Sequence, residues 1–439
     1  MKRLISLVTT RYAVLAENVA ARVGALVSLT FATMMVAWNG GPPAVGVYAL
    51  LRVLPSLVGV VIACGLPGAC AYFLAGPDRK NRRLPLTIVA MAIVGGAAGA
   101  TFWLATTPVL AAFLFKDLSP WLVAAASGLV FTRVVVATAK SCSQGSDDLR
   151  GSNRVILTEE LNFLPVYGVL WLSGGSGYQT VIAGLLIADV ATATLAWSRL
   201  VRRRFFREAE APSLALGRRV AAYGLRAQVG GVITLMNLRL DFILLSVMAG
   251  PAVLGVYAVA SKFAELPKIL GQALTYVLYP RFARDGAAKS AAHARRLMTK
   301  AGALSSVAIV PLWFGSLFII PTVYGSQFKP AIVPAQIILL GLVLDGVGGV
   351  VTGYLYGVGR PGLNSWAMGA GLAMTLALDV ALIPHYGATG AAAASAIAYT
   401  TASLTLVAIF WWLARGATPD EGADQRELDR PLVRAETPS

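Results

Sequence analysis

Cysteine, histidine and acidic residues are scarce in this chain of 439 residues. Its three cysteines are too few for a disulfide framework, and its two histidines do not make up a set of metal ligands. No segment has the spacing of a nucleotide-phosphate loop, so we do not expect the chain to hydrolyse nucleotides. Lysine and arginine outnumber aspartate and glutamate by 37 to 21, a balance that also occurs in nucleic-acid-binding proteins.

Charged residues of both signs together make up only 13% of the chain, whereas 57% of its residues are hydrophobic and the mean hydropathy is +0.69. Crossing about 30 Å of hydrocarbon takes about 20 apolar residues in a helix. The apolar runs are continuous rather than alternating, which favours helices over barrel strands. We predict an all-α polytopic membrane protein with about twelve transmembrane helices, at 12–37, 46–74, 85–112, 119–140, 155–173, 178–200, 220–248, 252–280, 300–322, 331–357, 363–383 and 389–413.

The basic residues lie almost entirely on one side of these predicted helices. Alternate connections and the two ends of the chain hold 28 of the 37 lysines and arginines, and the opposite connections hold only Lys116 and Lys329. Because basic loops stay in the cytoplasm, both termini are predicted to be cytoplasmic. This placement explains the basic balance without a nucleic-acid partner.

A short segment occurs twice. Gly41-Pro42-Pro43-Ala44-Val45-Gly46-Val47-Tyr48-Ala49 returns 209 positions later as Gly250-Pro251-Ala252-Val253-Leu254-Gly255-Val256-Tyr257-Ala258. Both copies are predicted on the outer side, so the two halves share one orientation, as in transporters built from parallel repeats. The predicted organisation is a cytoplasmic N-terminus at 1–11, six-helix bundles at 12–200 and 220–414, a basic cytoplasmic linker at 201–219 and a disordered cytoplasmic tail at 415–439.

Several charged residues fall inside the predicted helices, where a charge costs about 2.5–3.5 kcal/mol even on the lenient insertion scale. Such residues pair across helices or snorkel to the surface, or else they face water or a ligand. In helix 252–280 the polar residues share one arc, which favours a water-filled path or a polar helix seam. A cavity lined by cations suits an anionic substrate such as a phosphate. The candidate head-group residues are Arg22, Arg52, Arg226, Lys262 and Lys268, and the candidate polar lining is Asn18, Asn237, Asp241, Glu265 and Gln272.

Intramembrane carboxylates have a second role in carriers, because proton- or sodium-coupled transport needs such groups. The candidates for coupling to H⁺ or Na⁺ are Glu17, Asp189, Asp345 and Asp379. Each carboxylate could equally cap a kink or hydrogen-bond a neighbouring helix. No metal site and no other cofactor is expected.

Five further motifs identify a relationship: Arg239-Leu240-Asp241, Gly255-Val256-Tyr257-Ala258-Val259-Ala260, Tyr279-Pro280-Arg281-Phe282, Tyr356-Gly357-Val358-Gly359-Arg360-Pro361, and the run from Ile383 to Ala394. With them, the chain resembles the Wzx-like polysaccharide flippases (O-antigen and exopolysaccharide transporters) of the multidrug/oligosaccharidyl-lipid/polysaccharide (MOP) exporter superfamily over residues 10–414.

This resemblance implies two six-helix bundles that move an undecaprenyl-pyrophosphate-linked oligosaccharide to the outer leaflet by alternating access. It also implies a bacterial cytoplasmic (inner) membrane protein that is not an enzyme and acts beside a polysaccharide polymerase and glycosyltransferases. Two alternatives belong to the same superfamily. A lipid II flippase typically has two further C-terminal helices, and a multidrug/ion antiporter uses acids and aromatics for cationic drugs. A membrane-embedded glycan polymerase or ligase would carry a large outer loop.

Overall fold

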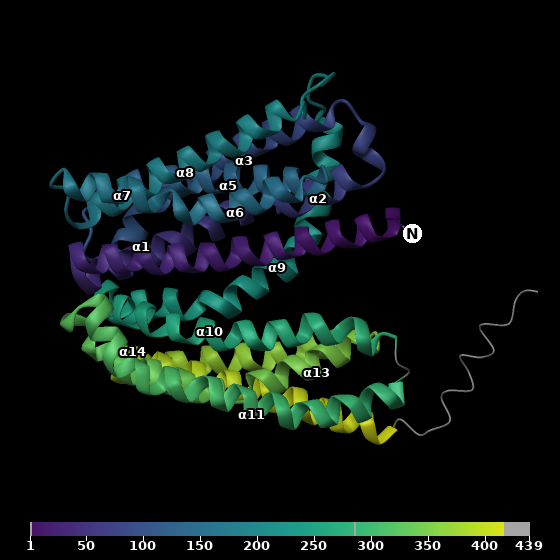
Figure 1. Ribbon diagram of the computed structural model, residues 1–439. Coiled ribbons are helices and arrows are strands. Elements are labelled where there is room, and N and C mark those ends of the chain that lie inside the picture. Colours follow the sequence, from purple (N-terminus) through teal and green to yellow (C-terminus); the bar gives the residue numbers. More distant parts are fainter. Residues whose placement is uncertain (1, 285–286, 417–439) are drawn as a thin grey trace, which may run out of the picture. The chain divides into compact units, whose positions relative to one another are not determined.

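The computed structural model describes residues 2–284 and 287–416, and these residues form helices without any strand (Figure 1). The first half contains α1 (Lys2–Ile62), α2 (Leu66–Ala75), η1 (Pro77–Lys80), α3 (Leu84–Phe113), α4 (Pro120–Ala125), α5 (Ser127–Gly145), α6 (Leu149–Leu161), α7 (Phe163–Leu172) and α8 (Gly177–Arg202). The second half contains α9 (Leu214–Ala249), α10 (Pro251–Phe282), α11 (Ala287–Ile319), η2 (Ile320–Tyr324), η3 (Ser326–Ala331), α12 (Ile332–Gly341), α13 (Asp345–Gly357) and α14 (Pro361–Gly416).

The two longest helices are each broken at a glycine. Gly41 in α1 has φ 66° and Gly387 in α14 has φ 53°, a left-handed conformation that glycine adopts without strain. The apolar parts of these helices, Ala20–Ile62 and Pro361–Arg415, comprise 43 and 55 residues. At 1.5 Å per residue each is more than about 60 Å long, enough for two crossings of a ~30 Å hydrocarbon core. The chain is therefore a multi-pass membrane protein.

Within the described residues, seven helices are long and apolar enough to cross a membrane, or eight if one bent pair of helices is a single crossing. That pair bends by 41° between η3–α12 and α13, and Asp345 begins α13. The predicted class of all-α polytopic membrane protein is confirmed, and the number twelve stays a prediction.

Several predicted helices are divided into shorter elements, including 46–74, 119–140, 155–173 and 331–357. The run 46–74 breaks between α1 and α2, where Gly65 has φ +64° and packs so closely on α9 that an added Cβ would lie 2.5 Å from the carbonyl oxygen of Gly224. The run 155–173 is divided at Asn162 into α6 and α7. Hydropathy does not locate the break at Gly65, because α1 and α2 are both apolar.

Packing divides the chain into two units. Unit 1 comprises the residues up to Val259 together with Ile319–Ala331 and Ile383–Ala388, and unit 2 comprises Ala260–Phe318, Ile332–Leu382 and the residues from Thr389 onward. The predicted bundles at 12–200 and 220–414 follow the internal repeat rather than this packing division, and their limits stay a prediction. The predicted tail at 415–439 lies almost entirely outside the described residues.

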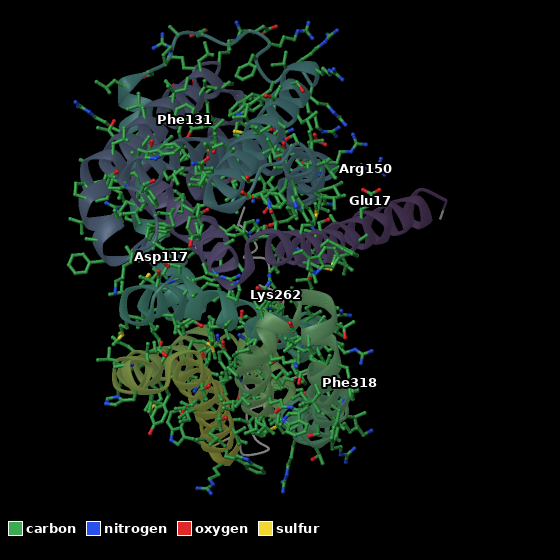
Figure 2. The ribbon with its side chains drawn as sticks, turned by 90° about the vertical axis from the view of Figure 1, so that its left-hand side faces the viewer. Glu17, Asp117, Phe131, Arg150, Lys262 and Phe318 are labelled. Atoms are coloured by element: carbon green, nitrogen blue, oxygen red, sulfur yellow. The ribbon has the colours of Figure 1, made fainter. Side chains whose placement is uncertain are left out.

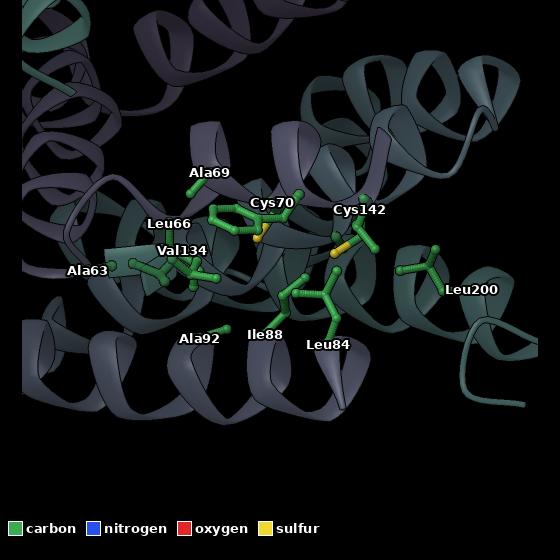
Figure 3. Packing of buried hydrophobic residues seen from close by; sticks show 14 of the residues in the cluster. Ala63, Leu66, Ala69, Cys70, Leu84, Ile88, Ala92, Val134, Cys142 and Leu200 are labelled. Atoms are coloured by element: carbon green, nitrogen blue, oxygen red, sulfur yellow. The ribbon is translucent and has the colours of Figure 1, made fainter. Parts of the chain in front are cut away.

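The core of unit 1 forms where α2, α3 and α5 meet, and residues of α6, α8 and α9 complete it (Figures 1 and 3). Figure 3 shows Leu84 and Ile88 of α3 beneath Cys70 of α2 and Cys142 of α5. Both cysteines are free thiols without solvent exposure, so they serve as small apolar side chains. This apolar core holds rigid the helices that carry the polar side chains described below.

The two copies of the repeated segment meet inside unit 1. A Cβ added to Gly46 would lie 1.8 Å from the carbonyl oxygen of Pro251, and a Cβ added to Gly255 would lie 1.8 Å from that of Pro42. The contacts are reciprocal, as expected for two equivalent segments related by a local twofold axis. Only glycine permits this approach of the two backbones.

Candidate functional site

Arg22 lies on the exposed side of α1, and amide side chains hold it in place. Its Nε donates a hydrogen bond to Oδ1 of Asn18 at 3.0 Å, one helical turn earlier. Nδ2 of Asn18 donates in turn to Oδ1 of Asn153 on α6 at 2.6 Å. Among the described residues no carboxylate pairs with Arg22, so its positive charge is not neutralised within this part of the chain.

A charged pair flanks this chain of amides. Arg150 of α6 lies 3.1 Å from Glu17 of α1, and Figure 2 shows the two labelled side chains close together at the edge of unit 1. Both are largely exposed, and such pairs contribute little to stability. Glu17, a predicted coupling acid, is thus an ion-pair partner in this structure.

Arg52, a predicted head-group residue, is mostly buried and forms an ion pair with Glu160 of α6. Its guanidinium also lies 5.6 Å from the ring centre of Tyr48. Arg52 therefore differs from Arg22, because a carboxylate already compensates its charge.

Unit 1 also contains a buried charged cluster, of which the sequence singled out only Arg52 and Asp189 as candidates. Arg133 of α5 lies 2.9 Å from Glu159 of α6 and 2.9 Å from Asp189 of α8, and Lys140 lies 3.1 Å from Glu159. Thr132 donates a further hydrogen bond to Asp189 at 3.2 Å. Together with the pair Arg52–Glu160, three cations face three carboxylates, so this buried cluster has no net charge. Asp189, a predicted coupling acid, thus forms an ion pair with Arg133.

In unit 2, two lysines of the polar arc predicted in helix 252–280 contact side chains of α10 itself and of α14. Nζ of Lys262 lies 3.7 Å from Glu265, one turn further along α10. Nζ of Lys268 lies 3.9 Å from the ring centre of Tyr399 on α14, a cation–π contact. The carboxylate of Asp345 lies against Gly271 and is close enough to interact electrostatically with Lys268. Tyr399 orients Lys268 without cancelling its charge.

The other predicted residues have varied surroundings. Asp241 is buried and accepts hydrogen bonds from the backbone N–H of Phe242 and from the hydroxyl of Tyr257. Asp379 is fully buried, and the side chains of Arg226 and Gln272 are exposed. The side chain of Asn237 lies outside the described residues.

A family model described as "polysaccharide biosynthesis protein" matches residues 41–333, well over half of the chain. The chain belongs to this family. Membership confirms the resemblance found in the sequence motifs.

A curated relative of this family member is the probable low-salt glycan biosynthesis flippase Agl15 of the archaeon Haloferax volcanii. The two sequences are 23% identical over 279 residues, which are 62% of this chain and 58% of the relative. The match thus spans little more than half the length of the relative.

Solved structures show the fold. One similar structure is an inward-facing multidrug resistance MATE family transporter of the MOP superfamily, with a TM-score of 0.73 and 13% sequence identity. The match covers 90% of this chain and 95% of the transporter chain. Another is the lipid II flippase MurJ in an inward closed conformation, with a TM-score of 0.72 and 14% sequence identity. This match covers 91% of this chain and 90% of the MurJ chain. At these identities the likeness establishes a MOP-type fold, not a substrate.

Proposed function

We propose that this family member is a flippase for an undecaprenyl-pyrophosphate-linked oligosaccharide. It moves the lipid-linked glycan from the cytoplasmic to the outer leaflet by alternating access, for cell-surface polysaccharide biosynthesis. Membership in the polysaccharide biosynthesis protein family supports the pathway, and the name of the archaeal relative supports the class of activity. The membrane is the bacterial cytoplasmic membrane with both termini inside, and the neighbouring enzymes are a polysaccharide polymerase and glycosyltransferases.

The observation that carries the proposal is the uncompensated charge of Arg22. A guanidinium that is fixed by a neutral amide and exposed at its tip is a binding group for phosphate oxygens, which it contacts in a bidentate manner. Lys268, held by an aromatic ring and near the carboxylate of Asp345, offers a second cation in unit 2. A cationic drug would be repelled by these groups.

Coupling of transport to H⁺ or Na⁺ is part of the proposal. Glu17 and Asp189 form ion pairs with arginines, and an ion-paired carboxylate has to release its partner before it can bind an ion. Asp345 has no basic group within ion-pair distance among the described residues, and it begins a helix at a bend. Discontinuous helices commonly carry ion sites in transporters. Asp345 is therefore the first coupling acid to test.

The test uses proteoliposomes with purified protein and a fluorescent undecaprenyl-pyrophosphate oligosaccharide, whose exposure is followed by an external glycan-cleaving enzyme. We expect protein-dependent exposure that Arg22→Ala and Lys268→Ala reduce by at least about tenfold, as for the loss of a charged hydrogen bond. Arg79→Ala, which removes an exposed cation of η1, is the matched control. If the wild-type protein does not expose the glycan but exports an organic cation, the proposed function is wrong.

A further inference from the structure

Asn153 lies at the base of a chain of three side chains that ends at Arg22. Its Oδ1 accepts from Asn18 Nδ2 at 2.6 Å, and Asn18 Oδ1 accepts from Arg22 Nε at 3.0 Å. Asn153 is buried at 6% exposure, Asn18 is half-buried and Arg22 is exposed. The chain of hydrogen bonds therefore runs from the packed interior of α6 through α1 to an exposed guanidinium.

Arg22 differs from the other arginines of unit 1 in the kind of group that holds its guanidinium. Arg150, Arg52 and Arg133 on α6, α1 and α5 are each paired with at least one carboxylate, which fixes the guanidinium and neutralises it. Arg22 is fixed by an amide, which accepts a hydrogen bond but carries no charge. The arrangement orients a guanidinium and leaves its full positive charge available.

If Asn153 served only to pack α6 against α1, a buried asparagine would be less favourable there than an apolar residue. Its Nδ2 is buried and makes no hydrogen bond to any described residue, so the donors of its amide are unused. An apolar residue would fill a buried helix contact without that penalty. What Asn153 does provide is the acceptor that orients the amide of Asn18.

We propose that Asn153 and Asn18 are positioning residues that present the two Nη groups of Arg22 to the pyrophosphate of the lipid-linked substrate. The inference rests on the proposed function, because that function supplies the anionic ligand. Nε of Arg22 is occupied by Asn18, so the outer edge of the guanidinium binds two phosphate oxygens. Loss of Asn153 frees Asn18 and Arg22 to rotate, and the substrate must then bear the entropy of ordering them.

Three substitutions separate positioning from packing. Asn153→Ala removes the base of the chain. Asn18→Asp keeps an acceptor for Arg22, and the amide of Asn153 can turn over to donate to the new carboxylate, so the packing is preserved while the charge of Arg22 is neutralised. Asn39→Ala is the matched control, because Asn39 is another asparagine of α1 that donates across to a neighbouring helix, to Tyr167 at 2.9 Å, without contacting a cation.

The measurement is the affinity of the full-length protein in detergent for undecaprenyl pyrophosphate, with glycan exposure in proteoliposomes alongside. We expect Asn153→Ala, Asn18→Asp and Arg22→Ala each to weaken binding about tenfold or more, and Asn39→Ala to leave it unchanged. In the Arg22→Ala background, Asn153→Ala should cause no further loss, because the residue acts through Arg22.

Wild-type affinity in either Asn18→Asp or correctly folded Asn153→Ala would overturn the inference, as would losses that add to that of Arg22→Ala. Its failure is distinguishable from failure of the proposed function. If the wild-type protein transports and Arg22→Ala does not, but the asparagine variants transport normally, only the positioning role is wrong. If the wild-type protein binds the pyrophosphate through this chain without transporting it, only the flippase activity is wrong.

Discussion

Gly46 and Gly255 each lie against the carbonyl group of the proline near the start of the other's segment. The two glycines occupy the same position in the two copies of a nine-residue repeat, 209 residues apart. The repeat thus has a structural role beyond common ancestry, because its glycines allow the backbones of both copies to touch. This contact lies within unit 1 and joins the part of α1 that follows its break at Gly41 to the start of α10.

We predict that Gly46→Ala and Gly255→Ala each destabilise the protein by about 1–3 kcal/mol or more, because the added Cβ meets a backbone atom rather than a flexible side chain. The double variant should be less destabilised than the sum of the two, because either methyl group already separates the segments. Thermal unfolding in detergent measures this. Gly68→Ala in α2, where an added Cβ meets nothing within 4 Å, is the control. Equal midpoints for Gly46→Ala and Gly68→Ala would contradict the described contact.

The neutral cluster around Arg133 gives a second prediction. Glu159→Gln leaves Arg133 and Lys140 with one carboxylate fewer in a buried site, and breaking such a pair costs about 3–5 kcal/mol. Glu208→Gln breaks the exposed pair with Arg82 and should cost at most about 1 kcal/mol. Denaturation midpoints of the two variants measured side by side test this. A loss for Glu208→Gln as large as that for Glu159→Gln would show that burial does not decide the effect.

Stability should also depend on pH through Asp148, which lies outside the apolar helices. Two hydrogen bonds from Arg199 at 2.8 Å each, and one from the backbone N–H of Gly151 at 3.1 Å, hold the pKa of this carboxyl below its ordinary value of 3.8. The lower pKa in the folded state means that this stabilisation is present above pH 3.8 and is lost as the pH falls through the folded-state pKa.

Asp148→Asn should therefore lower the unfolding midpoint at pH 7, and the difference from the wild type should shrink below pH 3.8. Asp147→Asn is the neighbouring control, because Asp147 makes no ion pair among the residues that the structure describes. A difference between Asp148→Asn and the wild type that stays constant with pH would contradict the role assigned to Arg199.

The cation–π contact of Lys268 leads to a prediction for binding. Tyr399→Phe keeps an aromatic ring and should leave the affinity for undecaprenyl pyrophosphate nearly unchanged. Tyr399→Leu removes the ring and should weaken binding by about twofold to fivefold, corresponding to about 0.5–1 kcal/mol. The same titration in detergent measures both variants. A loss in Tyr399→Phe equal to that in Tyr399→Leu would indicate that the hydroxyl, not the ring, matters.

Much of the fold could be predicted from the sequence, because the length and continuity of apolar runs follow directly from the thickness of a bilayer. The breaks at Gly41 and Gly387 fall in the predicted connections 38–45 and 384–388, but the break at Gly65 could not be predicted, because hydropathy is averaged over neighbouring residues and the residues on both sides of Gly65 are apolar. The left-handed conformation of Gly65 depends on the backbone of α9, far along the chain.

The candidate site could be predicted from the sequence only in part. Arg22 is conspicuous as a charge in an apolar helix, but nothing in the sequence connects it to Asn153, because an isolated asparagine has no periodicity or spacing that identifies its partner. Glu159 and Glu160 did carry a signal, two acids inside a predicted transmembrane run that follows Arg133. The pairing of Arg52 with Glu160 depends on how α1 packs on α6, which only the tertiary structure reveals. The roles of the predicted head-group residues stay predictions.

The neutral cluster has a consequence for how the chain enters the membrane during synthesis. Arg133 of α5 leaves the ribosome before Glu159 and Asp189, the carboxylates that neutralise it. A lone arginine or lysine at the centre of a helix opposes insertion by about 2.5–3.5 kcal/mol. We therefore expect α5 to wait beside the insertion machinery until α6 and α8 arrive. Nascent chains ending before α6 should insert α5 poorly, and chains that extend past α8 should insert it fully, as glycosylation mapping would show.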